Sequence, residues 1–161
     1  MAVTNQYSSE YDQAFVSESG QLVPHELHGR VRVAFFTHAQ DGAGDAGSDA
    51  IIAKLPAGRV RLLASQSKAY VNWTTASATL DLGWGAYTDI NGDAVAVSVN
   101  GIDNGISVEA AGYQTFGSGL TATGGTKVFE SSDGVTIIAT STDTAIADGD
   151  DLVGFLLYVV D

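Results

Sequence analysis

The chain has 161 residues, no cysteine and a formal net charge of -12. The missing thiols exclude disulfides, thiolate metal sites and cysteine nucleophiles, and the acidic balance disfavours nucleic acid and anionic membranes as partners. The first ten residues contain neither a basic residue nor an apolar core, and no apolar run could span a bilayer, so we expect a protein made in a cytoplasm without a signal peptide.

The composition changes along the chain. Residues 1–28 hold few β-branched side chains, so we expect an N-terminal arm at 1–28 and a β-sandwich domain at 29–161. Six of the seven basic residues lie between 30 and 68, and twelve acids from Tyr70 onward face Lys127 alone. Solubility explains this acidity more simply than a cationic ligand does.

The arm carries an aromatic stripe. Tyr7, Tyr11 and Phe15 recur at i, i+4 and i+8, and they would share one face if residues 8–17 were helical. A helix that short is marginal in water, so it needs a surface to pack on. That surface is either the chain's own sandwich or a neighbouring subunit.

The first predicted strand is the alternating run from 30 to 38. Its expected core face consists of Val31, Val33 and Phe35. Its expected wet face consists of Arg30, Arg32 and Ala34. The Gly-rich stretch 40–49 that follows predicts a mobile loop.

The next two runs, 50–55 and 59–64, flank a turn. Pro56 suits the first central position of a type I turn and Gly58 closes it, so we expect an antiparallel hairpin. Arginines alternate with apolar residues in this hairpin as they do in the first strand. A cationic strip facing an acidic partner would consist of Arg30, Arg32, Arg59 and Arg61. Ordinary solvation of the strands is the alternative interpretation.

The remaining chain is rich in turns. Asn-Gly or Asp-Gly pairs begin at 41, 91, 100, 104, 133 and 148 and favour tight hairpins between short Val-, Ile- and Thr-rich runs. The stretch 101–125 predicts a long loop with at most one short strand. The run 152–160 is apolar on both faces and predicts a central strand, with Gly154 marking a bulge or a close backbone approach. We therefore predict an all-β fold, an antiparallel β-sandwich that is jelly-roll-like.

Little in the sequence points to chemistry. His25 and His28 have a metal-ligand spacing only in a helix, which Pro24 and Gly29 disfavour, and with His38 they specify no complete site. The acidic turns at 89–93 and 148–151 could bind calcium, but hairpin turns have the same composition. The chain has no nucleophile elbow, because Gly117-Ser118-Gly119 is expected in a loop, and it has no phosphate loop. We expect no enzymatic activity, no cofactor and no metal.

Four aromatic residues could form a sugar-stacking platform on a sandwich: Trp73, Trp84, Tyr87 and Tyr113. As strand residues they would more often be core or interface anchors.

The order of elements nevertheless resembles a known family. The turn at 55–60 (Leu-Pro-Ala-Gly-Arg-Val), the run 79–84 (Thr-Leu-Asp-Leu-Gly-Trp), the acidic turn after Tyr87 and the closing strand 153–160 are similar to those of tailed-bacteriophage head decoration, or cement, proteins. The resemblance implies a virion structural protein on the capsid exterior that bridges capsomers, with the phage major capsid protein as partner and a homo-oligomeric state, trimer or dimer. The competing function is a receptor- or carbohydrate-binding module of a virion appendage.

The arm and the arginines are the candidate contacts with the capsid or a neighbouring subunit. They comprise Tyr7, Tyr11, Phe15, Arg30, Arg32, Arg59 and Arg61.

Overall fold

The computed structural model describes residues 30–73 and 75–160, and these residues form an antiparallel all-β fold, as predicted. The strands are β1 (Val31–Ala39), β2 (Asp49–Leu55), β3 (Gly58–Leu62), β4 (Lys68–Val71), β5 (Thr79–Trp84), β6 (Tyr87–Thr88), β7 (Ala94–Val95), β8 (Ser98–Ser107), β9 (Gly112–Thr115), β10 (Lys127–Ser131), β11 (Val135–Ser141) and β12 (Asp151–Val160). Two short 3-10 helices, η2 (Ala64–Gln66) and η3 (Ser118–Thr123), complete the described elements.

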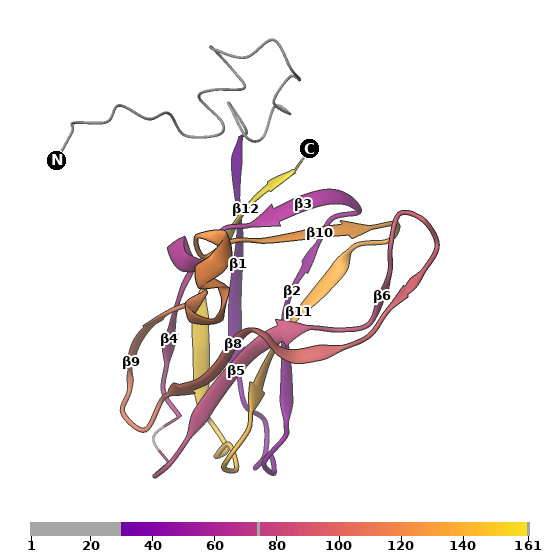
Figure 1. Ribbon diagram of the computed structural model, residues 1–161. Coiled ribbons are helices and arrows are strands. Elements are labelled where there is room, and N and C mark those ends of the chain that lie inside the picture. The colour runs from indigo at the N-terminus through magenta and orange to yellow at the C-terminus, as the bar shows by residue number, and fades with distance from the viewer. Residues whose placement is uncertain (1–29, 74, 161) are drawn as a thin grey trace, which may run out of the picture.

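Two sheets pack face to face (Figure 1). In the six-stranded sheet β12 lies between β1 on one side and β3 followed by β4 on the other, while β10 pairs with β3 and β9 with β4. The four-stranded sheet has the order β2-β11-β5-β8. A separate hairpin, β6–β7, projects from the connection between β5 and β8.

The connections between strands identify a jelly roll. The helix η2 separates β3 from β4, and η3 separates β9 from β10. Each pair therefore takes the place of a single strand that a short helix interrupts. Six connections then cross from one sheet to the other: β1 to β2, β2 to β3, β4 to β5, β8 to β9, β10 to β11 and β11 to β12. Such crossings distinguish a jelly roll from a meander of hairpins.

The predicted hairpins were therefore mostly wrong, although the turns exist. Pro56 and Gly58 join β2 to β3, but these strands belong to different sheets. Of the six Asn-Gly and Asp-Gly pairs, the one at 91 closes a hairpin, β6–β7. Glycine provides a positive φ at five of these turns, for example 93° at Gly92, which allows a sharp change of direction but does not choose the partner strand.

The predicted faces of β1 were reversed. Val31, Val33 and Phe35 are 50%, 45% and 79% exposed, whereas Phe36 is 7% exposed and belongs to the core. Both faces of this strand carry apolar side chains, so alternation alone could not tell which face points inward. Ala34, expected on the wet face, packs against the core beside Phe36.

Two stretches expected to be loops are more ordered than predicted. Residues 101–125 contain most of the ten-residue strand β8, the strand β9 and the helix η3. The many glycines obscured these elements, because β8 uses them at bulges and close contacts. The loop 40–48 is held by a bridge between Gly44 and Ile146, with both N–H···O distances at 2.9 Å.

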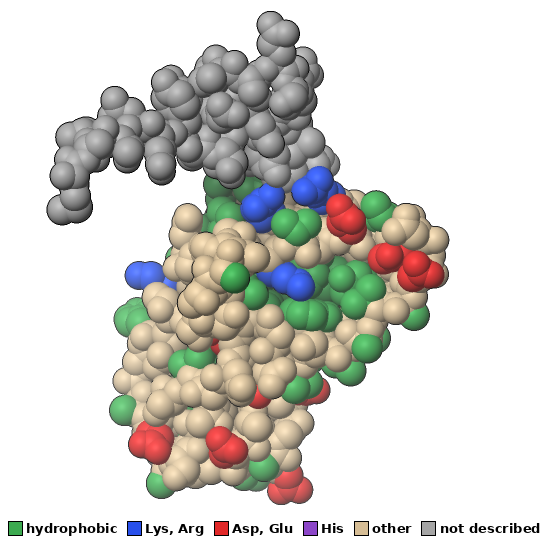
Figure 2. Space-filling model, viewed as in Figure 1, with side chains coloured by type: hydrophobic (Ala, Val, Ile, Leu, Met, Phe, Trp, Pro, Cys, Tyr) green, Lys and Arg blue, Asp and Glu red, His purple; other side chains and the backbone are tan. Residues whose placement is uncertain are grey.

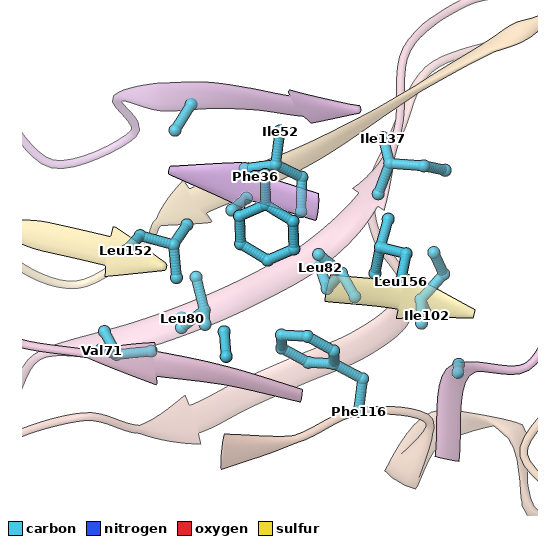
Figure 3. Close-up of a cluster of buried hydrophobic side chains, with 14 of the residues drawn as sticks. Phe36, Ile52, Val71, Leu80, Leu82, Ile102, Phe116, Ile137, Leu152 and Leu156 are labelled. Carbon is cyan, nitrogen blue, oxygen red and sulfur yellow. The ribbon is translucent and has the colours of Figure 1, made fainter. Parts of the chain in front are cut away.

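The last strand is central, as predicted. Leu152 and Leu156 of β12 are fully buried in the core between the sheets, together with Phe36, Ile52 and Leu82 (Figure 3). A Cβ on Gly154 would lie 2.2 Å from the carbonyl oxygen of Lys68, so the neighbouring strand approaches too closely for any side chain.

A buried serine repairs the break in the six-stranded sheet. Where η2 separates β3 from β4, Ser67 is fully buried, and its hydroxyl donates to the Leu63 carbonyl and accepts from the Leu157 N–H, both at 2.9 Å. These bonds pair backbone groups that the ladder leaves without partners at this point. The sheet is therefore continuous enough to present one outer face.

Candidate interaction surface

The structure separates the four candidate arginines. Arg59 and Arg61 point away from the core, because the alternate residues Val60 and Leu62 of the same strand are buried. Arg32 shares the opposite side of the sheet with Ala34 and Phe36, at the exposed end of β1. The described arginines therefore do not form one strip on one face.

The arginines of β3 have partners of their own. Arg59 Nε lies 3.6 Å from Glu130 Oε1 on the adjacent β10, an ion pair between partly exposed side chains. Arg61 lines a hollow of about 420 Å³ with Leu120, Lys127 and Val128. Figure 2 shows Lys and Arg side chains near the end of the molecule where β3 and β10 lie, and acidic side chains both at the right of that end and at the opposite loop end.

The aromatic residues do not form the sugar platform that the sequence allowed. Trp73 is 1% exposed and belongs to the core. Trp84 and Tyr87 pack edge-on against the buried Phe129, at 5.5 and 6.2 Å between ring centroids. Tyr113 is 79% exposed and packs against Tyr70 on the outer face of the six-stranded sheet. The four residues thus fall into separate places.

Lys127 covers the exposed part of this aromatic cluster. Its Nζ lies 4.7 Å from the Trp84 ring, a cation–π contact that keeps the ammonium at the mouth of the hollow. Burial raises the pKa of Tyr87, and the carboxylates of Asp89 and Glu130 raise it further. The Tyr87 hydroxyl therefore remains neutral and is no candidate base.

The outer face of the six-stranded sheet is the most apolar exposed surface among the described residues. Strand register places its side chains in four rows. From one end of the sheet to the other, the rows are Val31–Val159–Arg61–Val128, Val33–Leu157, Phe35–Phe155–Lys68–Thr115 and Thr37–Val153–Tyr70–Tyr113. Within these rows Val159 is buried and Phe155 and Leu157 are half-buried. We call this surface the apolar outer face.

Ring contacts hold the apolar outer face together. Phe35 and Phe155 meet edge to face at 6.3 Å, and Tyr70 and Tyr113 do so at 5.5 Å. Its four rows contain Arg61 and Lys68, and the next row at each end of the same sheet face carries one carboxylate, Glu130 beside Arg59 and Asp151 beside Ala39. The sequence analysis missed this surface, although β12 with apolar residues on both faces was a signal that its second face also needs a partner.

The acidic turn 89–93 lies in the β6–β7 hairpin, where Asp89 forms a bridge with Ser131 of β10. The acidic loops 40–48 and 148–151 lie together at the opposite end of the sandwich. Their carboxylates mostly accept local hydrogen bonds: Asp148 from the Gly42 N–H and Asp150 from the Ala147 N–H, both at 2.9 Å. Within residues 30–73 and 75–160, no three His, Asp or Glu side chains are placed to hold a metal ion. His38 Nε2 lies 3.3 Å from Gln40 Oε1, while His25 and His28 lie outside the described residues.

The Gly117-Ser118-Gly119 segment has a structural role. Ser118 begins η3, and its N–H donates to Asp103 at 2.7 Å, while its hydroxyl and the Gly117 N–H donate to the same carboxylate. Asp103 is fully buried in β8 of the other sheet. The bonds therefore tie η3 to the four-stranded sheet.

Among the described helices, none is long and apolar enough to cross a membrane.

Comparison with known proteins gave structural matches alone. No protein-family model and no curated protein matches the chain. A chain from the capsid of Ralstonia phage GP4 matches with a TM-score of 0.62 and 20% identity, over 95% of this chain and 96% of that one. A chain of the cyanophage Pam1 capsid asymmetric unit matches over 100% of both chains, with a TM-score of 0.49 and 18% identity. A chain of infectious bursal disease virus strain Gx matches 81% of this chain and 32% of that one, with a TM-score of 0.44 and 13% identity. The first match shows a shared fold.

Proposed function

We propose that this chain is a virion structural protein that binds the outer surface of a phage capsid and bridges or stabilises capsomers. The observation that carries the proposal is the fold shared with a chain of the GP4 capsid along almost the whole length of both. The resemblance of its turns and closing strand to decoration proteins supports the same role. The proposed partner is the phage major capsid protein.

The surface of the described residues fits a protein whose work is adhesion. Its largest feature is a sheet face with exposed apolar side chains, such as Phe35 at 79% and Tyr113 at 79%. Large apolar patches on soluble proteins commonly mark sites of protein association. Arg61 lies in this face and Arg59 borders it, while the arm residues Tyr7, Tyr11 and Phe15 lie outside the described residues and remain proposed contacts.

The test follows the chain through particle purification. Intact virions from the source that encodes the chain are separated from free protein on a density gradient, and the fractions are probed with an antibody against residues 30–160. We expect the chain in the particle band and gold-labelled antibody on the heads of unopened particles in negative stain.

Two controls make this test decisive. Antibody against an internal head protein must label only opened particles. A chain absent from the particle band, or labelled only after opening, would contradict an exterior structural role. Label confined to a tail or head fibre would instead favour the receptor- or carbohydrate-binding module.

A further inference from the structure

We propose that the apolar outer face of the six-stranded sheet binds residues 1–28 of a neighbouring copy of this chain. This interaction would form in the free protein as well as in particles. It can therefore be tested separately from the proposed capsid role.

The first argument is that this face needs a cover. Val31, Val33 and Phe35 stand on β1, an edge strand that pairs with β12 on one side. A long apolar edge strand with unpaired backbone groups promotes uncontrolled association unless something covers it. Phe155 and Val153 extend the exposed surface across the centre of the sheet.

The second argument is chemical complementarity. The first 28 residues carry four carboxylates, at Glu10, Asp12, Glu18 and Glu26, and no Lys or Arg. The four rows of the apolar outer face contain Arg61 and Lys68, and the acids of the same sheet face, Glu130 and Asp151, lie in the rows beyond its two ends. Lys68 is exposed beside Phe155 near the centre of the face. Tyr7, Tyr11 and Phe15 supply the rings that such a face can bury. Aromatic residues flanked by acids thus match an apolar surface that carries lysine and arginine.

The third argument is the point where the arm leaves the sheet. It precedes Arg30 and therefore starts at the Val31 end of the outermost strand, opposite the acidic loops (Figure 1). To reach Phe35 or Val153 of its own sheet, the arm would have to reverse direction at once. A length of 28 residues can span up to roughly 90 Å when extended, which reaches a neighbouring subunit. Exchange of arms around a closed ring would cover every copy of the face.

The absence of cysteine makes a cross-linking test clean. Full-length Tyr11→Cys is mixed with full-length Val153→Cys under mild oxidation, and the disulfide-linked heterodimer is measured by mass spectrometry. We expect at least tenfold more of it than from Tyr11→Cys mixed with Ile51→Cys. Ile51 is the matched control because it is 70% exposed on the other sheet.

A second measurement tests the energetic role of the face. Sedimentation of full-length Phe35→Ser should show a dissociation constant for self-association at least tenfold above that of the parent chain. Ile51→Ser should stay within twofold of the parent. Circular dichroism melts of both variants verify that each remains folded.

Several outcomes would overturn the proposal. Equal cross-linking to Val153→Cys and Ile51→Cys would remove the arm from this face. A Tyr11→Cys, Val153→Cys double variant that forms mainly an intrachain disulfide would place the arm on its own sheet. Homodimers of Val153→Cys that exceed the mixed product would make the neighbour's sheet, rather than its arm, the occupant.

Discussion

The two sheets share one core but have different outer faces. On the four-stranded sheet the outward polar groups bond to one another: Thr140 Oγ1 donates to Asp49 at 2.5 Å, and Thr79 Oγ1 donates to Asp143 at 2.6 Å. Asp81 on the same face is 2% exposed and accepts the Gly105 N–H at 2.6 Å. The outer face of the six-stranded sheet has exposed aliphatic and aromatic side chains instead.

The backbone also covers one face and leaves the other open. A Cβ on Gly83 of β5 would lie 1.9 Å from the Ser98 carbonyl oxygen, because β8 folds closely over this position. No described element lies over Phe35 or Tyr113, each 79% exposed. The difference teaches that stability and association are divided between the sheets: the four-stranded sheet completes its own polar bonding, and the six-stranded sheet offers a surface to a partner.

We expect the largest effect from deletion of β12, the central strand of the six-stranded sheet, because the two sheets can then no longer form one sandwich. Deletion of 152–161 removes Leu152 and Leu156 from the core, takes away the described strand partner of β1, and leaves β3 and β4 paired on one side alone, with β10 and β9. We expect no cooperative thermal transition by far-ultraviolet circular dichroism. Deletion of residue 161 alone is the control and should leave the transition in place. A cooperative melt of the longer truncation would show that β12 is not essential to the sandwich.

A smaller effect comes from the buried carboxylate that links the sheets. In Asp103→Ala the N–H groups of Gly117 and Ser118 lose their acceptor in a buried place, which should cost about 3 kcal/mol. For a chain of this size that lowers the melting temperature by about 6–12 °C. The matched variant Asp81→Ala frees one N–H and should cost about 1–2 kcal/mol. Equal losses of unfolding free energy in the two variants would mean that Asp103 contributes no more to stability than Asp81. Other contacts would then hold η3 in place.

Acid should loosen the hairpin that projects from the four-stranded sheet. The backbone N–H of Asp93, with further bonds from Asn91, lowers the pKa of Asp89. The turn is therefore stabilised above the ordinary carboxyl pKa, and this contribution is lost as the pH falls through the lowered pKa of the folded state. Amide exchange at Asn91 and Asp93 should accelerate below about pH 4, and not in Asp89→Asn. Protection that persists to pH 2 would refute this account.

The smallest expected effect is that of a chelator on the acidic loop end, which both sheets share. Since Asp148 and Asp150 accept backbone N–H bonds, the loops need no ion to balance them. The melting temperature should stay within about 2 °C in excess chelator. A larger fall would assign calcium to the acidic turns.

The sequence was sufficient for the class of fold and for the central strand. Short β-branched runs between Asn-Gly and Asp-Gly turns predicted antiparallel sheets, and a strand apolar on both sides predicted the place of β12. The pairing of strands could not be read in this way, because a positive φ at Gly92 or Gly134 sets only a local direction. One of these turns closes a hairpin, whereas the other sends the chain into the opposite sheet.

The candidate site was harder to predict, for a related reason. Choosing between Val33 and Ala34 as the inward residue requires knowing which side of β1 the other sheet covers. That depends on the pairing of β1 with β12, more than a hundred residues later in the chain. The position of the arginines could not be predicted for the same reason. Arg32 and Arg61 lie on opposite sides of the six-stranded sheet, and the alternation within each strand does not reveal this. The acidic turns at 89–93 and 148–151 have a composition that fits both calcium ligands and hairpin turns, so the sequence leaves both interpretations open.

The pairing of Val31 with Val159 has a consequence for how the protein is made. Among the described residues, the strand partner of β1 is β12, so the contact order is high and folding is expected on the millisecond-to-second scale. During synthesis β1 cannot pair in this way until β12 has emerged from the ribosome. Translation that stops before β12 would then release chains in which the apolar strand β1 is exposed and unpaired. We expect chaperones to bind such chains before an assembly partner can.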